Sequence, residues 1–270
     1  MREPVTYLFV PGNRPDRFAK AAASGADALV LDLEDAVTPD AKEAAREHVA
    51  AWIATHPEVA ERAVVRINDR STPWYDADIA MLKPAGVRAV MLPKAEGPDA
   101  VADVVAAAPS GSRILPLVES ALGVARVDAI ASARGVARLV FGTLDYALDL
   151  DLSGDHEGLA YAAARIAIAS RCAGLAGPVA GVTSAIDDET RQRDDVRFAR
   201  AHGFTAKLCI HPRQVALAKA LLQPGADEIA WARKVVAAAA AGGNAIQVDG
   251  RMVDRPVVQR AQSLLARAGD

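Results

Sequence analysis

The stretch ADALVLDLEDAV, residues 26–37, begins as an apolar run and ends in three acids, Asp32, Glu34 and Asp35. A continuous run of leucine, valine and alanine is typical of a strand that is buried on both faces, as in a parallel sheet covered by helices. We therefore interpret residues 26–37 as a buried parallel strand followed by an acidic turn. The function of these acids has to be sought in the rest of the chain.

Similar apolar runs begin at Thr6, Ala63, Arg88, Arg113, Arg138, Pro178 and Ala206. Alanine-rich segments with helical spacing separate them, so the chain contains eight β/α repeats. Eight repeats in a chain near the typical length of about 250 residues favour a closed (β/α)8 TIM barrel. A doubly wound open sheet is the alternative, and the absence of GxGxxG after the first strand weakens it. We predict a barrel over residues 1–222 and a short helical appendage over residues 223–270, packed on the barrel or on a neighbouring subunit.

The composition excludes several classes of partner. The net charge of −3, from 31 basic and 34 acidic residues in 270, offers no basic field for nucleic acid or an anionic membrane surface. The chain has no apolar segment of 18 residues and no signal-peptide pattern. Cys172 and Cys209 lie in apolar runs without metal-binding spacing, which predicts buried, reduced thiols. We expect a cytoplasmic protein with neither nucleic-acid nor membrane partners.

Polar residues collect where the predicted strands end. Because barrel active sites are built at the carboxyl ends of the strands, these positions are the candidates for chemistry. Glu119 and Asp145 are 26 residues apart, which is one β/α unit, so they should project from adjacent strands. Two carboxylates suit Mg²⁺, which fills its remaining positions with water and substrate oxygens. The five histidines are scattered, so a zinc site is not expected. For Asp35 and its neighbours, capping of the next helix is the alternative.

Eight motifs occur in order along nearly the whole chain. They are LFVPGNRPDRF (8–18), LDLEDAV (31–37), VRIN (65–68), LPKAE (92–96), PLVES (116–120), FGTLDYALDL (141–150), KLCIHPRQV (207–215) and DGRMVDRP (249–256). Together they resemble the citrate lyase β-subunit-like branch of the HpcH/HpaI aldolase superfamily. The resemblance implies a barrel of the phosphoenolpyruvate/pyruvate-binding type, assembled as a homotrimer or hexamer. It also implies that Mg²⁺, or Mn²⁺ in its place, supports the making or breaking of a carbon–carbon bond in acyl thioesters.

The resemblance assigns the metal to Glu119 and Asp145, the pair that the spacing also selects. It makes Arg66 of VRIN the binder of a keto acid's carboxylate, and a guanidinium fork suits that group bidentately. A structural salt bridge to Glu34 or Asp35 is the alternative for Arg66. The resemblance implies that these two acids hydrogen-bond metal-bound water, which leaves Asp32 with a structural role.

The resemblance also assigns residues at the two ends of the chain. Asp254 matches an aspartate that reaches into a neighbouring subunit's site and handles the proton on the thioester's α-carbon. The alternative is a turn aspartate before Pro256. Arg14 and Arg17 would meet the phosphates of coenzyme A or of a phosphopantetheine arm, unless they are ordinary surface arginines.

The predicted activity is a Mg²⁺-dependent lyase reaction on 3-hydroxy-acyl thioesters such as citryl-, malyl- or citramalyl-CoA. Cleavage gives an acyl thioester and an α-keto acid, and condensation is its reverse. A Schiff-base aldolase that uses Lys94 or Lys207 is one alternative. A ligand-binding subunit that needs a carrier partner is another.

Overall fold

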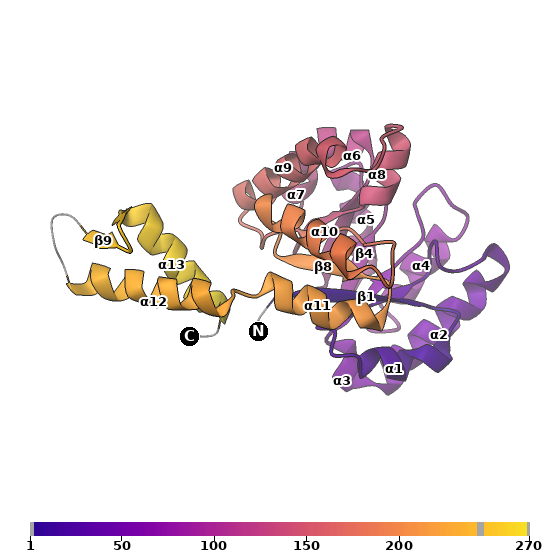
Figure 1. Cartoon of the computed structure of the whole chain (residues 1–270). Coiled ribbons are helices and arrows are strands. Elements are labelled where there is room, and N and C mark those ends of the chain that lie inside the picture. The colour runs from indigo at the N-terminus through magenta and orange to yellow at the C-terminus, as the bar shows by residue number, and fades with distance from the viewer. Residues whose placement is uncertain (1–2, 242–245, 269–270) are drawn as a thin grey trace. The chain divides into compact units, whose positions relative to one another are not determined.

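A computed structural model describes residues 3–241 and 246–268. Its first part is a closed barrel of eight parallel strands in the order β1 to β8 (Figure 1). The strands are β1 (Thr6–Pro11), β2 (Ala28–Asp32), β3 (Ala63–Arg66), β4 (Ala89–Leu92), β5 (Arg113–Val118), β6 (Val140–Phe141), β7 (Val179–Ala180) and β8 (Ala206–Cys209). The predicted (β/α)8 barrel is confirmed.

Helices follow each strand and cover the barrel. They are η1 (Pro15–Arg17), α1 (Phe18–Ala22), η2 (Pro39–Ala41), α2 (Lys42–Thr55), α3 (Pro57–Ala60), α4 (Tyr75–Leu82), α5 (Pro98–Ala107), α6 (Ala121–Ala125), α7 (Val127–Ala131), α8 (Thr143–Asp149), α9 (His156–Cys172), α10 (Glu189–Ala201) and α11 (Pro212–Leu222). Short polar turns join the strand ends to these helices, so all the candidate residues at the carboxyl ends emerge on one side of the barrel.

The two faces of each strand bury different side chains. On β2, Ala28 and Val30 pack in the barrel interior, whereas Leu29 and Leu31 pack against the helices. Both faces are buried, which explains why the strand sequences are continuously apolar. The register places Asp32 beside Arg66 at the ends of β2 and β3, and this pairing matters for the site.

The chain forms two compact units, Met1–Ala218 and Lys219–Asp270. The second unit contains α12 (Ala226–Ala241), the antiparallel hairpin of β9 (Ile246–Val248) and β10 (Arg251–Val253), and α13 (Arg255–Ala268). Its own small core is formed by Ala232, Val235, Val248, Val253, Ala261 and Leu264. The predicted boundary after residue 222 lies at the end of α11, and the predicted packing of the appendage stays a prediction.

Two predictions about the surface have different outcomes. Cys209 is buried as expected, but the prediction of a buried Cys172 is wrong, since the last residue of α9 is exposed.

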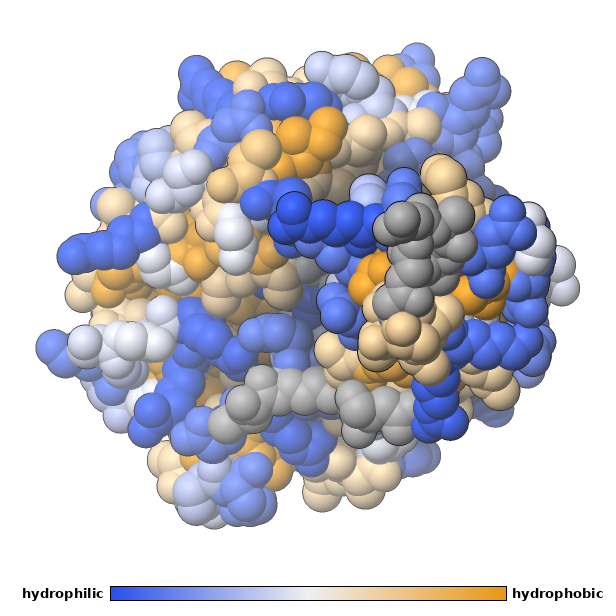
Figure 2. All heavy atoms as spheres, turned by 90° about the vertical axis from the view of Figure 1, so that its left-hand side faces the viewer, coloured by the Kyte–Doolittle hydropathy of each residue, from blue (hydrophilic) through white to orange (hydrophobic). Residues whose placement is uncertain are grey.

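Among the described helices, none combines the length and apolar character required to cross a membrane. Figure 2 shows one face of the molecule, on which hydrophilic and hydrophobic residues are intermixed.

Candidate active site

A cavity of about 980 Å³ opens at the carboxyl ends of the barrel strands. It is at the upper end of the usual size of small-molecule sites, about 300–1,000 Å³. Five predicted site residues line it together: Arg17, Asp35, Arg66, Glu119 and Asp145. The barrel thus brings residues from four different βα loops and one strand end into a single space.

Glu119 follows β5 and is almost completely buried, with 4% of its surface exposed. The backbone N–H of Lys94 donates to its Oε1 at 2.7 Å. On its other side lies Gly142, where a Cβ atom would collide with Oε2. Burial raises the pKa of Glu119 to about 8. The charges of Glu34 and Asp145 add to this rise, whereas the Lys94 amide opposes it.

Asp145 lies in the first turn of α8, is partly buried and faces the same cavity as Glu119. Within residues 3–241 and 246–268, no three His, Cys, Asp or Glu side chains are grouped so as to hold a metal ion. The site therefore offers two carboxylates, the number that Mg²⁺ commonly takes from a protein. A buried glutamate with a raised pKa beside a second acid fits a cation, because a divalent ion would compensate both charges.

Lys94 has a left-handed backbone with φ of +45°, one of three non-glycine residues with positive φ in the described chain. This conformation is uncommon for a residue with a Cβ atom and is typical of functional sites. Here it accompanies the amide hydrogen bond to Glu119. This role of Lys94 has no signal in the sequence, because the lysine side chain suggested a chemical function whereas its backbone amide positions Glu119.

Arg66 is buried and pairs first with Asp32, its register neighbour. Nε donates to Oδ1 and Nη2 to Oδ2, both at 2.7 Å. Nη1 lies 2.9 Å from Glu34 Oε2 and 3.2 Å from Asp35 Oδ2. The alternative of a structural salt bridge is thus present. The expected bidentate binding of a substrate carboxylate by Arg66 is not what this geometry favours, because Asp32 already accepts the bidentate pair of hydrogen bonds from the guanidinium.

Glu34 is buried but does not belong to the cavity lining. Burial raises its pKa to about 7, although Arg66 opposes this rise. Its Oε2 contacts Arg66 as an ion pair and yet makes no hydrogen bond among the described residues. Asp35 is 64% exposed at its side chain. The two acids therefore differ: Glu34 is a desolvated carboxyl with an unfilled oxygen, and Asp35 is open to the cavity.

Cationic side chains stand on the rim of the cavity near β1 and β8. Arg17 is joined there by Lys20 and Arg213, which the sequence reasoning missed. The three-residue spacing of Arg17 and Lys20, one turn of helix, could have revealed the first of them. Arg14 is not in the lining and pairs bidentately with Asp16, at 2.8 and 2.7 Å.

Asp254 lies in the second compact unit, directly before α13. Its Oδ1 accepts a hydrogen bond from the Val257 amide at 3.1 Å, which caps the helix. The turn role considered for this residue is therefore present. Its predicted part in proton transfer stays a prediction.

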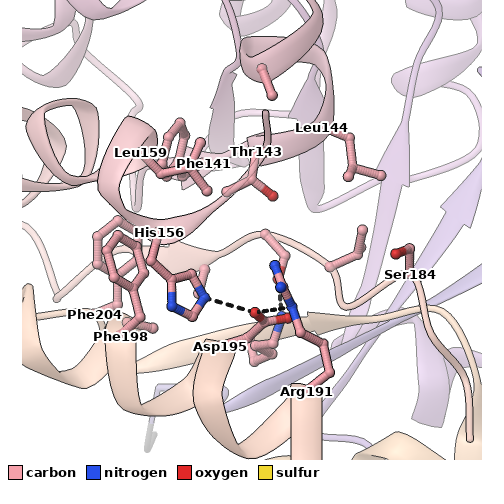
Figure 3. A pocket seen from close by; sticks show the side chains of 17 residues that line it. Phe141, Thr143, Leu144, His156, Leu159, Ser184, Arg191, Asp195, Phe198 and Phe204 are labelled. Carbon is pink, nitrogen blue, oxygen red and sulfur yellow. Dashed lines mark hydrogen bonds and ion pairs between the residues drawn. The ribbon is translucent and has the colours of Figure 1, made fainter. Parts of the chain in front are cut away.

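A second, smaller cavity lies among β6, β7, β8, α8, α9 and α10, and Figure 3 shows its lining. At its polar side Asp195 accepts from His156 Nε2 and pairs with Arg191 Nε, both at 2.9 Å. Lys207 lines this cavity and not the larger one. Its β8 neighbours Ala206 and Leu208 fill the barrel interior, so Lys207 points outward, where its Nζ donates to the Gly181 carbonyl.

This geometry weighs against a Schiff base. Burial lowers the pKa of Lys207 to about 8, as an aldolase lysine requires, but the side chain does not face the cavity that holds Glu119. Lys94 is partly exposed, and its neighbouring carboxylates, Glu34 foremost, outweigh partial burial and raise its pKa. A raised pKa keeps Lys94 protonated at neutral pH, which is unsuited to nucleophilic attack.

The family model HpcH/HpaI aldolase/citrate lyase matches residues 6–212. A citrate lyase subunit beta-like protein from Deinococcus radiodurans is 39% identical over 97% of this chain and 96% of its own length. An L-malyl-CoA/beta-methylmalyl-CoA lyase from Cereibacter sphaeroides is 32% identical over 97% of this chain and 93% of its own length.

Solved structures agree with these matches. The crystal structure of CitE from Mycobacterium tuberculosis in complex with magnesium, acetoacetate and coenzyme A is 33% identical to this chain. The match covers 98% of each chain with a TM-score of 0.86. The collinear motifs, the closed barrel and these matches over nearly the full length lead to one conclusion: this chain belongs to the HpcH/HpaI aldolase/citrate lyase family.

Proposed function

We propose that this protein is a Mg²⁺-dependent carbon–carbon lyase acting on 3-hydroxy-acyl thioesters of coenzyme A. The observation that supports this most is the placement of Glu119 and Asp145 in one cavity with Arg66. Family relatives named citrate lyase subunit beta and L-malyl-CoA/beta-methylmalyl-CoA lyase support the reaction class. The CitE complex with magnesium, acetoacetate and coenzyme A supports the same ligands here.

Glu119 and Asp145 would hold the ion, and Mn²⁺ could replace Mg²⁺. When bound, the ion supplies Lewis-acid polarisation at the oxygens of the keto acid. Arg66 would steady the substrate carboxylate with an η N–H, because its two-pronged face is bound to Asp32. Asp35, which lines the cavity, would accept hydrogen bonds from water around the ion. The buried Glu34 would support the site by holding Arg66, whose Nη1 lies 2.9 Å from Glu34 Oε2.

In cleavage, a carboxylate of the site or a water molecule takes the proton of the 3-hydroxyl, and the carbon–carbon bond breaks. Its electron pair passes to the thioester's α-carbon as an enolate, while the hydroxyl carbon becomes the carbonyl of the α-keto acid. Asp254 of a neighbouring subunit would protonate the enolate, or remove the same proton in condensation. Such general acid–base catalysis typically contributes about 10²–10⁴-fold.

We infer that the thioester carrier binds at the cationic rim of the cavity. Arg17, Lys20 and Arg213 would meet the phosphates of coenzyme A, or of an acyl carrier's pantetheine arm. The assignment of Asp254 to a neighbouring subunit's site requires an oligomer, and we propose a homotrimer or hexamer in the cytoplasm. Light scattering of the purified protein measures the assembly directly.

A turnover screen with Mg²⁺ tests the function. Citryl-, malyl- and citramalyl-CoA are offered separately, and the release of oxaloacetate, glyoxylate or pyruvate is followed. Asp145→Asn should abolish turnover. Glu157→Gln is the matched control, because Glu157 occupies the first turn of the next long helix, α9, and is exposed. Full activity of Asp145→Asn would remove the metal assignment.

Two alternatives appear as distinct results of the same screen. A subunit that depends on a carrier protein would leave every coenzyme A ester intact and cleave only the carrier-bound thioester. A Schiff-base enzyme would survive EDTA and form a covalent adduct with a keto acid and borohydride. We expect EDTA to abolish turnover and no adduct to form.

A further inference from the structure

Lys42 is the first residue of α2 and is buried, with 6% of its surface exposed. Its ammonium donates to the Leu33 carbonyl at 2.8 Å, to the Glu34 carbonyl at 2.8 Å and to Asn68 Oδ1 at 2.6 Å. An ammonium has three N–H donors, so every donor is used. The Trp74 ring lies 5.0 Å from the same nitrogen. Lys42 thus joins Leu33, Glu34 and Asn68 through a single ammonium group.

Two of the three acceptors of Lys42, the carbonyls of Leu33 and Glu34, belong to the acidic turn, defined as residues 33–37. From one side, Asp32 accepts the amides of Glu34 and Ala36, at 2.9 and 3.1 Å. From the other side, Lys42 binds the carbonyls of Leu33 and Glu34. The turn that presents Glu34 and Asp35 is therefore fixed through both its N–H and its C=O groups.

A second set of contacts holds Lys42 in place. Asp78, fully buried, accepts from the backbone N and the Nδ2 of Asn68, at 2.8 and 2.6 Å. Arg46 Nε donates to the other oxygen of Asp78 at 2.8 Å. Asn68 is thereby oriented with its Oδ1 toward Lys42. The chain of contacts connects α2 and α4 to the acidic turn.

We propose that Lys42 is a positioning residue that sets the shape of the acidic turn and, through Glu34 and Asp35, the affinity of the site for its divalent ion. This proposal rests on the proposed function for the identity of the ion. Loss of a group that orients the surroundings of a metal typically costs 10–100-fold in metal affinity or activity, and we expect a loss in this range.

The direction of the change in divalent-ion affinity distinguishes a positioning role of Lys42 from a purely electrostatic one. Removing a cation from an acidic site strengthens binding of a divalent ion by Coulomb attraction, whereas loss of positioning weakens it. Lys42→Met removes the charge and the three donors. Lys42→Arg keeps the charge, but its planar guanidinium does not match three converging acceptors. Positioning therefore predicts weaker binding in both variants.

The experiment measures Mn²⁺ affinity by the EPR signal of free Mn²⁺, with and without pyruvate, on the full chain. Lys83→Met is the control, because Lys83 is exposed at the end of α4 and outside the cavity. We expect wild-type affinity for Lys83→Met and at least tenfold weaker binding for both Lys42 variants. Circular dichroism checks the fold, and Lys42→Arg, which keeps the charge, serves if Lys42→Met does not fold.

The possible results are distinct. Equal or tighter Mn²⁺ binding by Lys42→Met, or wild-type binding by Lys42→Arg, overturns the positioning role and leaves the proposed function standing. Absence of Mn²⁺ binding by the wild type overturns the proposed function and the role of Lys42 together.

Discussion

Binding of the divalent ion should release a proton from Glu119. The metal-free glutamate has a pKa raised to about 8, so about nine-tenths of it is protonated at pH 7. A carboxylate must be ionised to bind a metal, and binding therefore expels this proton. We expect release of about 0.9 proton at pH 7, about 0.5 at pH 8 and about 0.1 at pH 9.

The same linkage fixes the pH dependence of affinity. Because the pKa is raised, protons compete with Mg²⁺ below pH 8, and the binding constant should fall about tenfold for each pH unit below that value. Above pH 8 the affinity should level off. If Glu34 also ionises on binding, it adds about 0.5 proton at pH 7, because its pKa is about 7.

Isothermal titration calorimetry in two buffers with different ionisation enthalpies counts the released protons. Asp145→Asn serves as the non-binding control. Glu34→Gln removes the second titrating acid while Glu119 remains, so release at pH 7 should persist in this variant. If the wild type binds Mg²⁺ at pH 7 with no buffer-dependent heat, Glu119 is already ionised or is not a ligand, and the reasoning fails.

Four further predictions follow from single contacts. Gly142→Ala should weaken Mn²⁺ binding at least tenfold as measured by EPR, since the added Cβ would collide with the Glu119 carboxylate. Wild-type affinity would show that the position of Glu119 does not depend on Gly142. Lys94→Gly should bind Mn²⁺ at least as tightly as the wild type, because it keeps the amide that Glu119 accepts and removes a nearby cation. It should also be about 1 kcal/mol more stable to urea than Lys94→Ala, because glycine adopts φ of +45° without strain; equal stabilities would refute this. Arg17→Ala should raise KM for the coenzyme A thioester about fivefold at low salt and leave kcat unchanged, an effect that high salt should erase. Between pH 8 and 10.5, Lys207 should be neutral in the folded protein and protonated in the unfolded chain. The free energy of unfolding of the wild type, relative to that of Lys207→Met, should therefore rise by about 1.4 kcal/mol per pH unit in this range. A difference that does not change with pH would show that Lys207 titrates normally.

The barrel and the placement of Glu119 and Asp145 in one cavity were predictable because both depend on repetition. Each buried parallel strand is an apolar run, and each run is followed by a helix, so counting units gives the topology. Glu119 and Asp145 are one unit apart, and the closed barrel then brings them to one cavity. No knowledge of rotamers or hydrogen bonds is needed for that step.

The partners within the site were not predictable in the same way. Asp32 binds the Arg66 guanidinium bidentately because the strand register places the two residues side by side, and the register could not be read from the sequence. A lysine at the start of a helix usually extends into solvent, and Lys42 is buried only because acceptors 8, 9 and 26 residues away converge on it. The backbone conformation of Lys94 has no signature in its side chain.

These contacts also answer why a buried strand ends in acids. Asp32 has a full set of partners, with Arg66 on its oxygens and the turn amides of Glu34 and Ala36 beside it. Glu34 and Glu119 are buried with raised pKa values, so the protein alone does not stabilise their charged forms. Arg66 and Lys94 lie beside Glu34 but do not offset its burial, so a divalent ion in the cavity would supply the further positive charge that favours the ionised carboxylates.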